Sequence, residues 1–204
     1  MNIIVFNPHP DDAEVLMGGT IASYTQKGHD VLMVVVTIPN QKEKRIKEAE
    51  KAATILGARI SLLDIDPYEL VFNRRLVEVF DEVMKAFSPD IIYTSWIHDS
   101  HQDHVAVSQA TIAAARKNNC SLYMFEQALP SGLTPYGFRA QTFVDISDTM
   151  ESKIKSVLAH ESQVQNFSEQ WIQGIRARAT YMGFQINVKY AEAFEVVKEL
   201  KEIC

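Results

Sequence analysis

The feature of this sequence that most constrains its fold is a series of short apolar runs separated by segments with helical spacing. Each run is apolar throughout and long enough for a buried strand. The runs are 3–6, 31–37, 60–63, 91–94 and 122–125. The segments between them that favour helix are 46–56, 76–87 and 105–116. Strands in which apolar and polar residues do not alternate are buried on both faces of the sheet. These strands are separated by helices along the chain, which indicates βαβ crossovers. The pattern predicts an α/β fold, a Rossmann-like doubly wound, mostly parallel sheet with helices on both faces.

The second half of the chain is expected to complete the same domain. Residues 126–138 contain two prolines and two glycines and predict a loop. The elements expected after it are a strand and two helices, at 142–146, 149–160 and 171–182. The tail at 191–203 fits a strand or a helix equally well. Because no linker, repeat or low-complexity stretch divides the sequence, we expect a single domain over residues 1–204.

Composition narrows the possible partners and location. Twenty Lys and Arg residues against 26 Asp and Glu residues give a net charge of −6. Without basic clusters, binding to nucleic acid or to an anionic membrane surface is disfavoured. No apolar run approaches the roughly 20 residues that cross a bilayer, and residues 1–7 read as a strand and not as a signal peptide. Cys120 and Cys204 form no CxxC pair, which disfavours a cysteine zinc site and favours a reducing, cytoplasmic location.

Two clusters of metal-binding residue types follow the first and fourth predicted strands. The segment 9–12 (HPDD) comes directly after the first strand, and 101–104 (HQDH) follows the fourth strand by a few residues. In a doubly wound sheet the fourth strand returns to lie beside the first, and ligands bind at the carboxyl ends of the strands where the order reverses. We therefore expect the clusters to meet in space, although about ninety residues separate them in sequence.

Imidazole and carboxylate groups without cysteine suit a catalytic Zn²⁺ that keeps one position open for water, although Mn, Fe or Co can use the same ligands. His9 and Asp12 are three residues apart at the start of a helix and can reach one ion. One histidine of the second cluster would complete the set, while the other faces the substrate. Asp11 and Asp103 are then left to act as a general base or to orient a histidine. The alternative is that these side chains only cap helices, which is less expected for two clusters at one edge.

The order of the motifs resembles that of the PIG-L/LmbE family of zinc-dependent N-deacetylases. The matching segments are HPDD at 9–12, GGT at 18–20, RxxE at 45–48, AxxLG at 53–57, HxDH at 101–104, HxSQ at 160–163 and AEAF at 191–194. The resemblance spans nearly the whole chain. It implies a metal-dependent hydrolase that removes an N-acetyl group from an N-acetylglucosamine-type sugar or glycoconjugate. The alternatives are an amidase on another amide, such as a thiol conjugate, and a sugar- or nucleotide-binding module with a vestigial metal site.

Residue roles follow from the resemblance, motif by motif. The implied ligands of Zn²⁺, or of another divalent transition metal, are His9, Asp12 and His104. Asp11 would be the general base. His101 would stabilise the oxyanion or act as a general acid, with Asp103 orienting it. Arg45 matches an arginine of the family's substrate pocket, and Gln102 replaces the usual proline of the second cluster.

Further expectations concern the surroundings of the site and the assembly. The loop at 126–138 is expected to border the pocket as a partial lid. Its Tyr136 and Phe138 would either stack on a sugar ring or pack beneath the loop. Trp171 is expected in the core. The resemblance implies a trimer or hexamer, and the apolar tail after Gly183 would form an interface or dock on the chain's own sheet. The sequence assigns no role to His98, His160 and Glu192.

Overall fold

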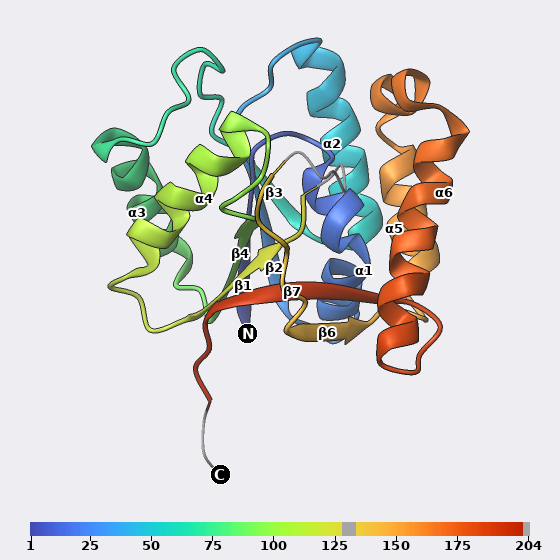
Figure 1. The fold of residues 1–204 in the computed structure, drawn as a ribbon. Helices are drawn as coiled ribbons and strands as arrows, with labels where there is room; N and C mark the ends of the chain where they lie inside the picture. Colours follow the sequence, from blue (N-terminus) through green and yellow to red (C-terminus); the bar gives the residue numbers. More distant parts are fainter. Residues whose placement is uncertain (128–133, 202–204) are drawn as a thin grey trace.

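A seven-stranded sheet organises the chain, with the strands in the order β3-β2-β1-β4-β5-β7-β6 (Figure 1). The structure, a computed structural model, describes residues 1–127 and 134–201, apart from the side chains of residues 167 and 168. The parallel strands are β1 (Asn2–Asn7), β2 (Asp30–Val35), β3 (Arg59–Leu62), β4 (Ile91–Ser95) and β5 (Ser121–Phe125). Both predictions, of a mostly parallel sheet and of the fourth strand beside the first, are confirmed.

Helices cover both faces of the sheet, as predicted (Figure 1). The helices of one face are α1 (Asp12–Gln26), α2 (Lys42–Leu56), α5 (Met150–Leu158) and α6 (Glu161–Gln185). Those of the other face are α3 (Arg74–Phe87) and α4 (Gln102–Ala115). No helix among the described residues has the length and apolar character that crossing a bilayer requires.

The apolar strands show no alternation because each lies between two helix layers. In β1, Ile3 and Val5 face the layer of α1, while Ile4 and Phe6 face the layer of α3 and α4. All four side chains have 0% exposure. Burial on both faces removes the polar positions that a one-sided strand would show.

The tail, which the sequence left open between strand and helix, forms a strand. β7 (Ala191–Lys198) lies antiparallel between β5 and β6 (Thr142–Asp145). Phe194 is fully buried in the core, which agrees with the expectation that the tail docks on the chain's own sheet. Val197 and Leu200 remain 39% and 47% exposed. Cys204 lies outside the described residues.

Candidate active site

The two His/Asp clusters lie side by side at the carboxyl edge of the sheet, as predicted. β1 ends at Asn7, and residues 9–12 form the turn that leads into α1. β4 pairs with β1 in parallel, and α4 begins with the second cluster shortly after β4 ends. The change of direction in strand order therefore brings residues of the two clusters into contact.

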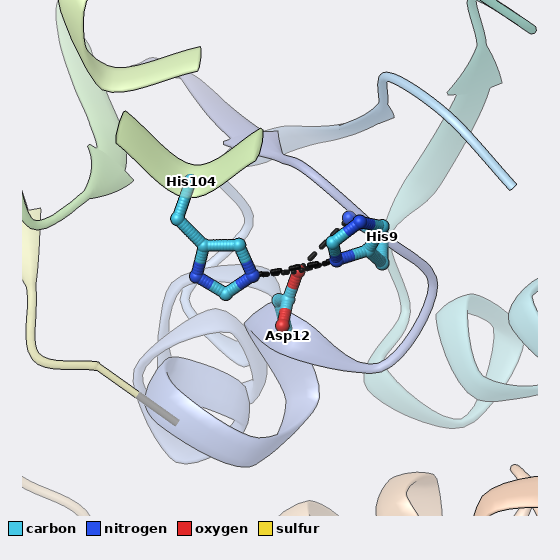
Figure 2. Close-up of side chains that lie close together, drawn as sticks. All are labelled: His9, Asp12 and His104. Carbon is cyan, nitrogen blue, oxygen red and sulfur yellow. Dashed lines mark hydrogen bonds and ion pairs between the residues drawn. The ribbon is translucent and has the colours of Figure 1, made fainter. Parts of the chain in front are cut away.

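Three side chains converge with the spacing of a metal site (Figure 2). His9 Nδ1 lies 3.4 Å from Asp12 Oδ2, and His104 Nε2 lies 3.4 Å from the same oxygen. The two ring nitrogens are 3.3 Å apart. Tetrahedral Zn²⁺ with bonds of about 2.0–2.1 Å places its ligand atoms about 3.3–3.4 Å from one another. All three residues are buried. Their donor atoms fit the implied ion in type, number and spacing, and we call His9, Asp12 and His104 the metal set.

In each histidine of this set, the ring nitrogen that faces away from Asp12 is hydrogen-bonded to a carboxylate. His9 Nε2 donates to Asp103 Oδ2 at 2.9 Å, and His104 Nδ1 donates to Asp99 Oδ2 at 2.8 Å. Such partners fix which ring nitrogen is free to bind a metal and raise its basicity. Asp99 lies outside the recognised motifs and was not predicted. The only sequence signal for it is a carboxylate in the short segment between the fourth strand and the second cluster.

The resemblance implied that Asp103 orients His101, and the Asp103 carboxylate contacts His9. The link between Asp103 and His101 runs through the backbone: the Asp103 N–H donates to His101 Nδ1 at 3.2 Å. His101 is the N-cap of α4, and its ring folds back over the first helical turn. A neutral His101 ring therefore carries its proton on Nε2 and can donate a hydrogen bond from that atom.

The electrostatics of the cluster favour positive charge. Burial lowers the pKa of His9, but its hydrogen bonds to Asp103 and Asp12 and their charges outweigh this and raise the pKa to about 9. Burial likewise opposes charge on His104, but the charge of Asp12 and the hydrogen bond that His104 donates to Asp99 raise the pKa of His104 overall. The nearby imidazoles lower the pKa of Asp12 despite its burial. Carboxylates that favour imidazolium also favour a metal cation in the same place.

Asp11 occupies a strained and largely buried position beside this set. Its φ of 100° lies in the left-handed region, which costs a non-glycine residue on the order of 1–3 kcal/mol. Arg45 Nη2 donates to the Pro10 carbonyl at 2.7 Å and lies 3.3 Å from Asp11 Oδ1. Burial raises the pKa of Asp11 to about 7, with the charge of Asp12 adding and that of Arg45 opposing. A carboxyl group whose pKa lies near neutral pH can both accept and return a proton.

These residues open onto a cavity of about 420 Å³. His9, Asp11, Arg45 and His101 line it, and its other walls include residues from the loop after β2 and from α6. Those residues are Asn40, Gln163 and Trp171. Trp171 packs against the core, as expected, and also faces this cavity.

Comparison with known proteins agrees with this geometry. The family model described as PIG-L, GlcNAc-PI de-N-acetylase, matches residues 4–115, which is more than half of the chain and includes both clusters. The chain belongs to the PIG-L family. A diacetylchitobiose deacetylase of Thermococcus kodakarensis is 30% identical to this PIG-L chain, and the match covers 96% of the chain and 82% of the relative.

Solved structures share the fold of this PIG-L chain. A conserved protein of Thermus thermophilus superimposes with a TM-score of 0.86 at 24% identity, covering 98% of this chain and 96% of that one. GalB, the 4-carboxy-2-hydroxymuconate hydratase of Pseudomonas putida KT2440, does so with a TM-score of 0.82 at 19% identity, covering 100% and 99%. Because a hydratase has this fold, the reaction has to be argued from the site residues.

Two of the residues without a predicted role clamp the PIG-L scaffold. Helix α1 departs from helical geometry at Met17, and Glu192 accepts the backbone N–H groups of Gly19 and Thr20, at 3.1 Å and 2.7 Å. Glu192 also pairs with the buried Lys153. His160 Nε2 donates to Glu14 Oε1 at 2.9 Å, with both side chains almost fully buried. Contacts of this kind fix α1, and with it the first cluster.

The segment after β5 does not place its aromatic residues in the cavity. Tyr136 stacks on His98 with ring centroids 4.1 Å apart, which also accounts for His98. Phe138 packs edge-on against Trp96, in keeping with the alternative of packing beneath the loop. Neither residue lines the cavity of the metal set. Residues 128–133 of the expected lid lie outside the described residues.

Proposed function

We propose that this PIG-L chain removes the N-acetyl group from an N-acetylglucosamine-type sugar or glycoconjugate in a metal-dependent hydrolysis. The observation that carries the proposal is the convergence of His9, Asp12 and His104 beside Asp11 and His101. A vestigial site in a binding module needs neither a base nor a second hydrogen-bond donor. The diacetylchitobiose deacetylase relative supports the substrate class.

The metal we propose is Zn²⁺, with His9 Nδ1, Asp12 Oδ2 and His104 Nε2 as ligands. Two nitrogens and one oxygen, with no cysteine, are typical of catalytic zinc. When bound, the ion would supply an acidified water and polarise the amide carbonyl. Asp103 and Asp99 would keep the ligand nitrogens of the two histidines aimed at one point.

The chain's own residues would move the protons. Asp11 takes a proton from the attacking water at its carboxylate, and Arg45 holds that carboxylate and the preceding carbonyl in place. His101 donates from Nε2 to the amide oxygen as negative charge develops there. One such donor is typically worth about 10²–10³ in rate. Asp11 can then return its proton to the leaving amine, since an amide anion is too basic to depart.

A panel of acetylated compounds tests the proposal. Acetate release would be measured from methyl N-acetylglucosaminide, N,N′-diacetylchitobiose and an N-acetylated cysteine conjugate, before and after metal removal. We expect release from the sugars, loss with a chelator and recovery with Zn²⁺. Release from the cysteine conjugate alone would favour the amidase alternative. The cytoplasmic location and the trimer or hexamer stay predictions.

A further inference from the structure

A second hollow adjoins the cavity of the metal set. It measures about 470 Å³ and lies between the loop joining β3 to α3 and the first turns of α4. Asp99 and Ser100 line both hollows, so the two meet at this segment. Figure 1 shows the loop standing beside the N-terminal part of α4.

We propose that this hollow binds the part of the substrate attached to the N-acetylated sugar, and that it selects a neutral group with an apolar face. The inference rests on the proposed function, because it assumes that the acetylated ring occupies the metal cavity. We call the hollow the neutral groove. Its defining residues are Tyr68, Val71, Phe72, Gln102, Val105 and Gln109.

The outer wall of the neutral groove is an exposed apolar cluster. Tyr68 is 96% exposed, Val71 54% and Phe72 49%, all within five residues. Scattered exposed apolar side chains need no explanation, but a contiguous group beside a cavity marks a binding surface. An aromatic ring in this position offers a flat face for the apolar side of a pyranose ring or for an apolar aglycone.

The loop presents these side chains from a fixed backbone. Leu70 is buried in the core, at 4% exposure. The Tyr68 N–H donates to Asp66 Oδ1 and the Glu69 N–H to Asp66 O, both at 2.9 Å. Because the loop is already ordered, binding loses less conformational entropy than it would with a flexible loop.

The inner wall determines the charge of the occupant. Gln102, Val105 and Gln109 lie at i, i+3 and i+7 on one face of α4, and their amides can hydrogen-bond hydroxyl groups. Among the described residues, no lysine or arginine lines the groove, and the only charged residue that does so is Asp99, whose carboxylate accepts from His104. A phosphate or carboxylate in the groove would therefore contact one negative charge and, among the described lining residues, no positive charge. A neutral sugar or an apolar group would contact a complementary surface.

Kinetics with one-ring and two-ring substrates test the inference. The substrates are methyl N-acetylglucosaminide and N,N′-diacetylchitobiose, and the variant is Tyr68→Ala. Loss of an aromatic face should lower the ratio of kcat/KM, two-ring over one-ring, by about three- to tenfold, mainly through KM. Tyr181→Ala is the matched control, because Tyr181 is 64% exposed on α6, on the other side of the sheet. An unchanged ratio in Tyr68→Ala would overturn the inference.

A charge introduced at the inner wall gives a second test with a gain of function. Gln109→Lys should raise kcat/KM for an N-acetylglucosaminide with a carboxylate aglycone by a few-fold relative to the methyl glycoside. Gln109→Glu, of nearly the same size as the native residue, should lower it. Equal effects of both variants on this kcat/KM would contradict the inference that the groove selects its occupant by charge.

Binding measurements separate failure of the groove from failure of the proposed function. Calorimetry would compare the affinities of the two sugars for the wild-type protein and for Tyr68→Ala, without turnover in the presence of a chelator. If the protein releases no acetate from either sugar, the proposed function fails. The groove is still supported if the wild-type protein binds the two-ring sugar more tightly than the one-ring sugar and Tyr68→Ala abolishes this difference. Equal affinities would overturn the groove. A change from oligomer to monomer in Tyr68→Ala would also overturn it, by assigning the surface to a second copy.

Discussion

The histidine rings of the metal set are oriented by carboxylates that are not among the three proposed ligands. Asp99 and Asp103 each accept from the ring nitrogen that faces away from Asp12. The sequence indicated the ligand residues, because their types and spacing are characteristic. It could not indicate which nitrogen of each ring is free, since that depends on which carboxylate faces each ring, and Asp103 is 94 residues from His9.

Asp99→Asn should weaken the metal affinity of the protein by about 10–100-fold while leaving the fold intact. An amide oxygen can still accept from His104 Nδ1, but it no longer supplies the negative charge that raises the basicity of the ring. Competition with a chelator measures the affinity. Asp148→Asn, at an exposed position, is the control. Unchanged affinity in Asp99→Asn would show that this carboxylate does not tune the ligand.

Asp11→Asn should keep the bound metal and lower acetate release by about 10²–10⁴-fold. The carboxamide is close in size to the native group, and it can accept a hydrogen bond but cannot take a proton at neutral pH. Metal content and steady-state hydrolysis would be measured on the same preparation. A variant that hydrolyses at nearly the wild-type rate would remove Asp11 from the role of base.

At the scale of elements, the strands and the helices α2, α3 and α4 followed from periodicity, but α1 gave no helical pattern. Its residues from Asp12 to Ala22 are all buried, so no polar face marks the helical period. The expected helix at 149–160 is α5, and α6 begins separately at Glu161. Segment β7, although the longest strand described at eight residues, was ambiguous because its partners come from distant parts of the chain.

Close packing between α1 and the segment after β6 predicts the cost of a side chain at Gly19. A Cβ there would lie 2.7–2.8 Å from three side-chain atoms of Ile146. Gly19→Ala should therefore lower the free energy of unfolding by about 1–3 kcal/mol. Gly174→Ala in α6, where a Cβ meets nothing within 4 Å, should be neutral or stabilising by up to about 1 kcal/mol. Denaturant titration compares the two, and equal stability would refute the packing argument.

The contact between His160, the N-cap of α6, and Glu14 of α1 predicts a pH-dependent contribution to stability. Burial lowers the pKa of His160, but the charge and hydrogen bond of Glu14 outweigh this and raise the pKa above its ordinary value of 6.5. The stabilisation is therefore fully present below the unfolded-state pKa and is lost as the pH rises through the higher folded-state pKa. The difference in unfolding free energy between wild type and His160→Asn should shrink from pH 6 to pH 9. A difference that grows with pH would contradict the assignment.

At the scale of the whole molecule, the topology of the sheet assembles the site. The reversal of strand order at β1 and β4 joins two clusters that are about ninety residues apart, and this was predictable from the order of strands and helices. The walls of the two hollows were not predictable. They come in part from loops and from α6, whose positions depend on packing that no local pattern encodes.

The most direct test of metal-dependent hydrolysis at this site measures metal content and acetate release together, on wild type, His104→Ala and His98→Ala. His98 serves as a matched control because its ring is exposed and stacks on Tyr136, away from the metal set. We predict about one zinc or other divalent ion per chain in the wild type and in His98→Ala, with acetate released from N,N′-diacetylchitobiose by both. His104→Ala should lose the metal and the activity together. Acetate release at the wild-type rate by metal-free His104→Ala would contradict metal-dependent hydrolysis.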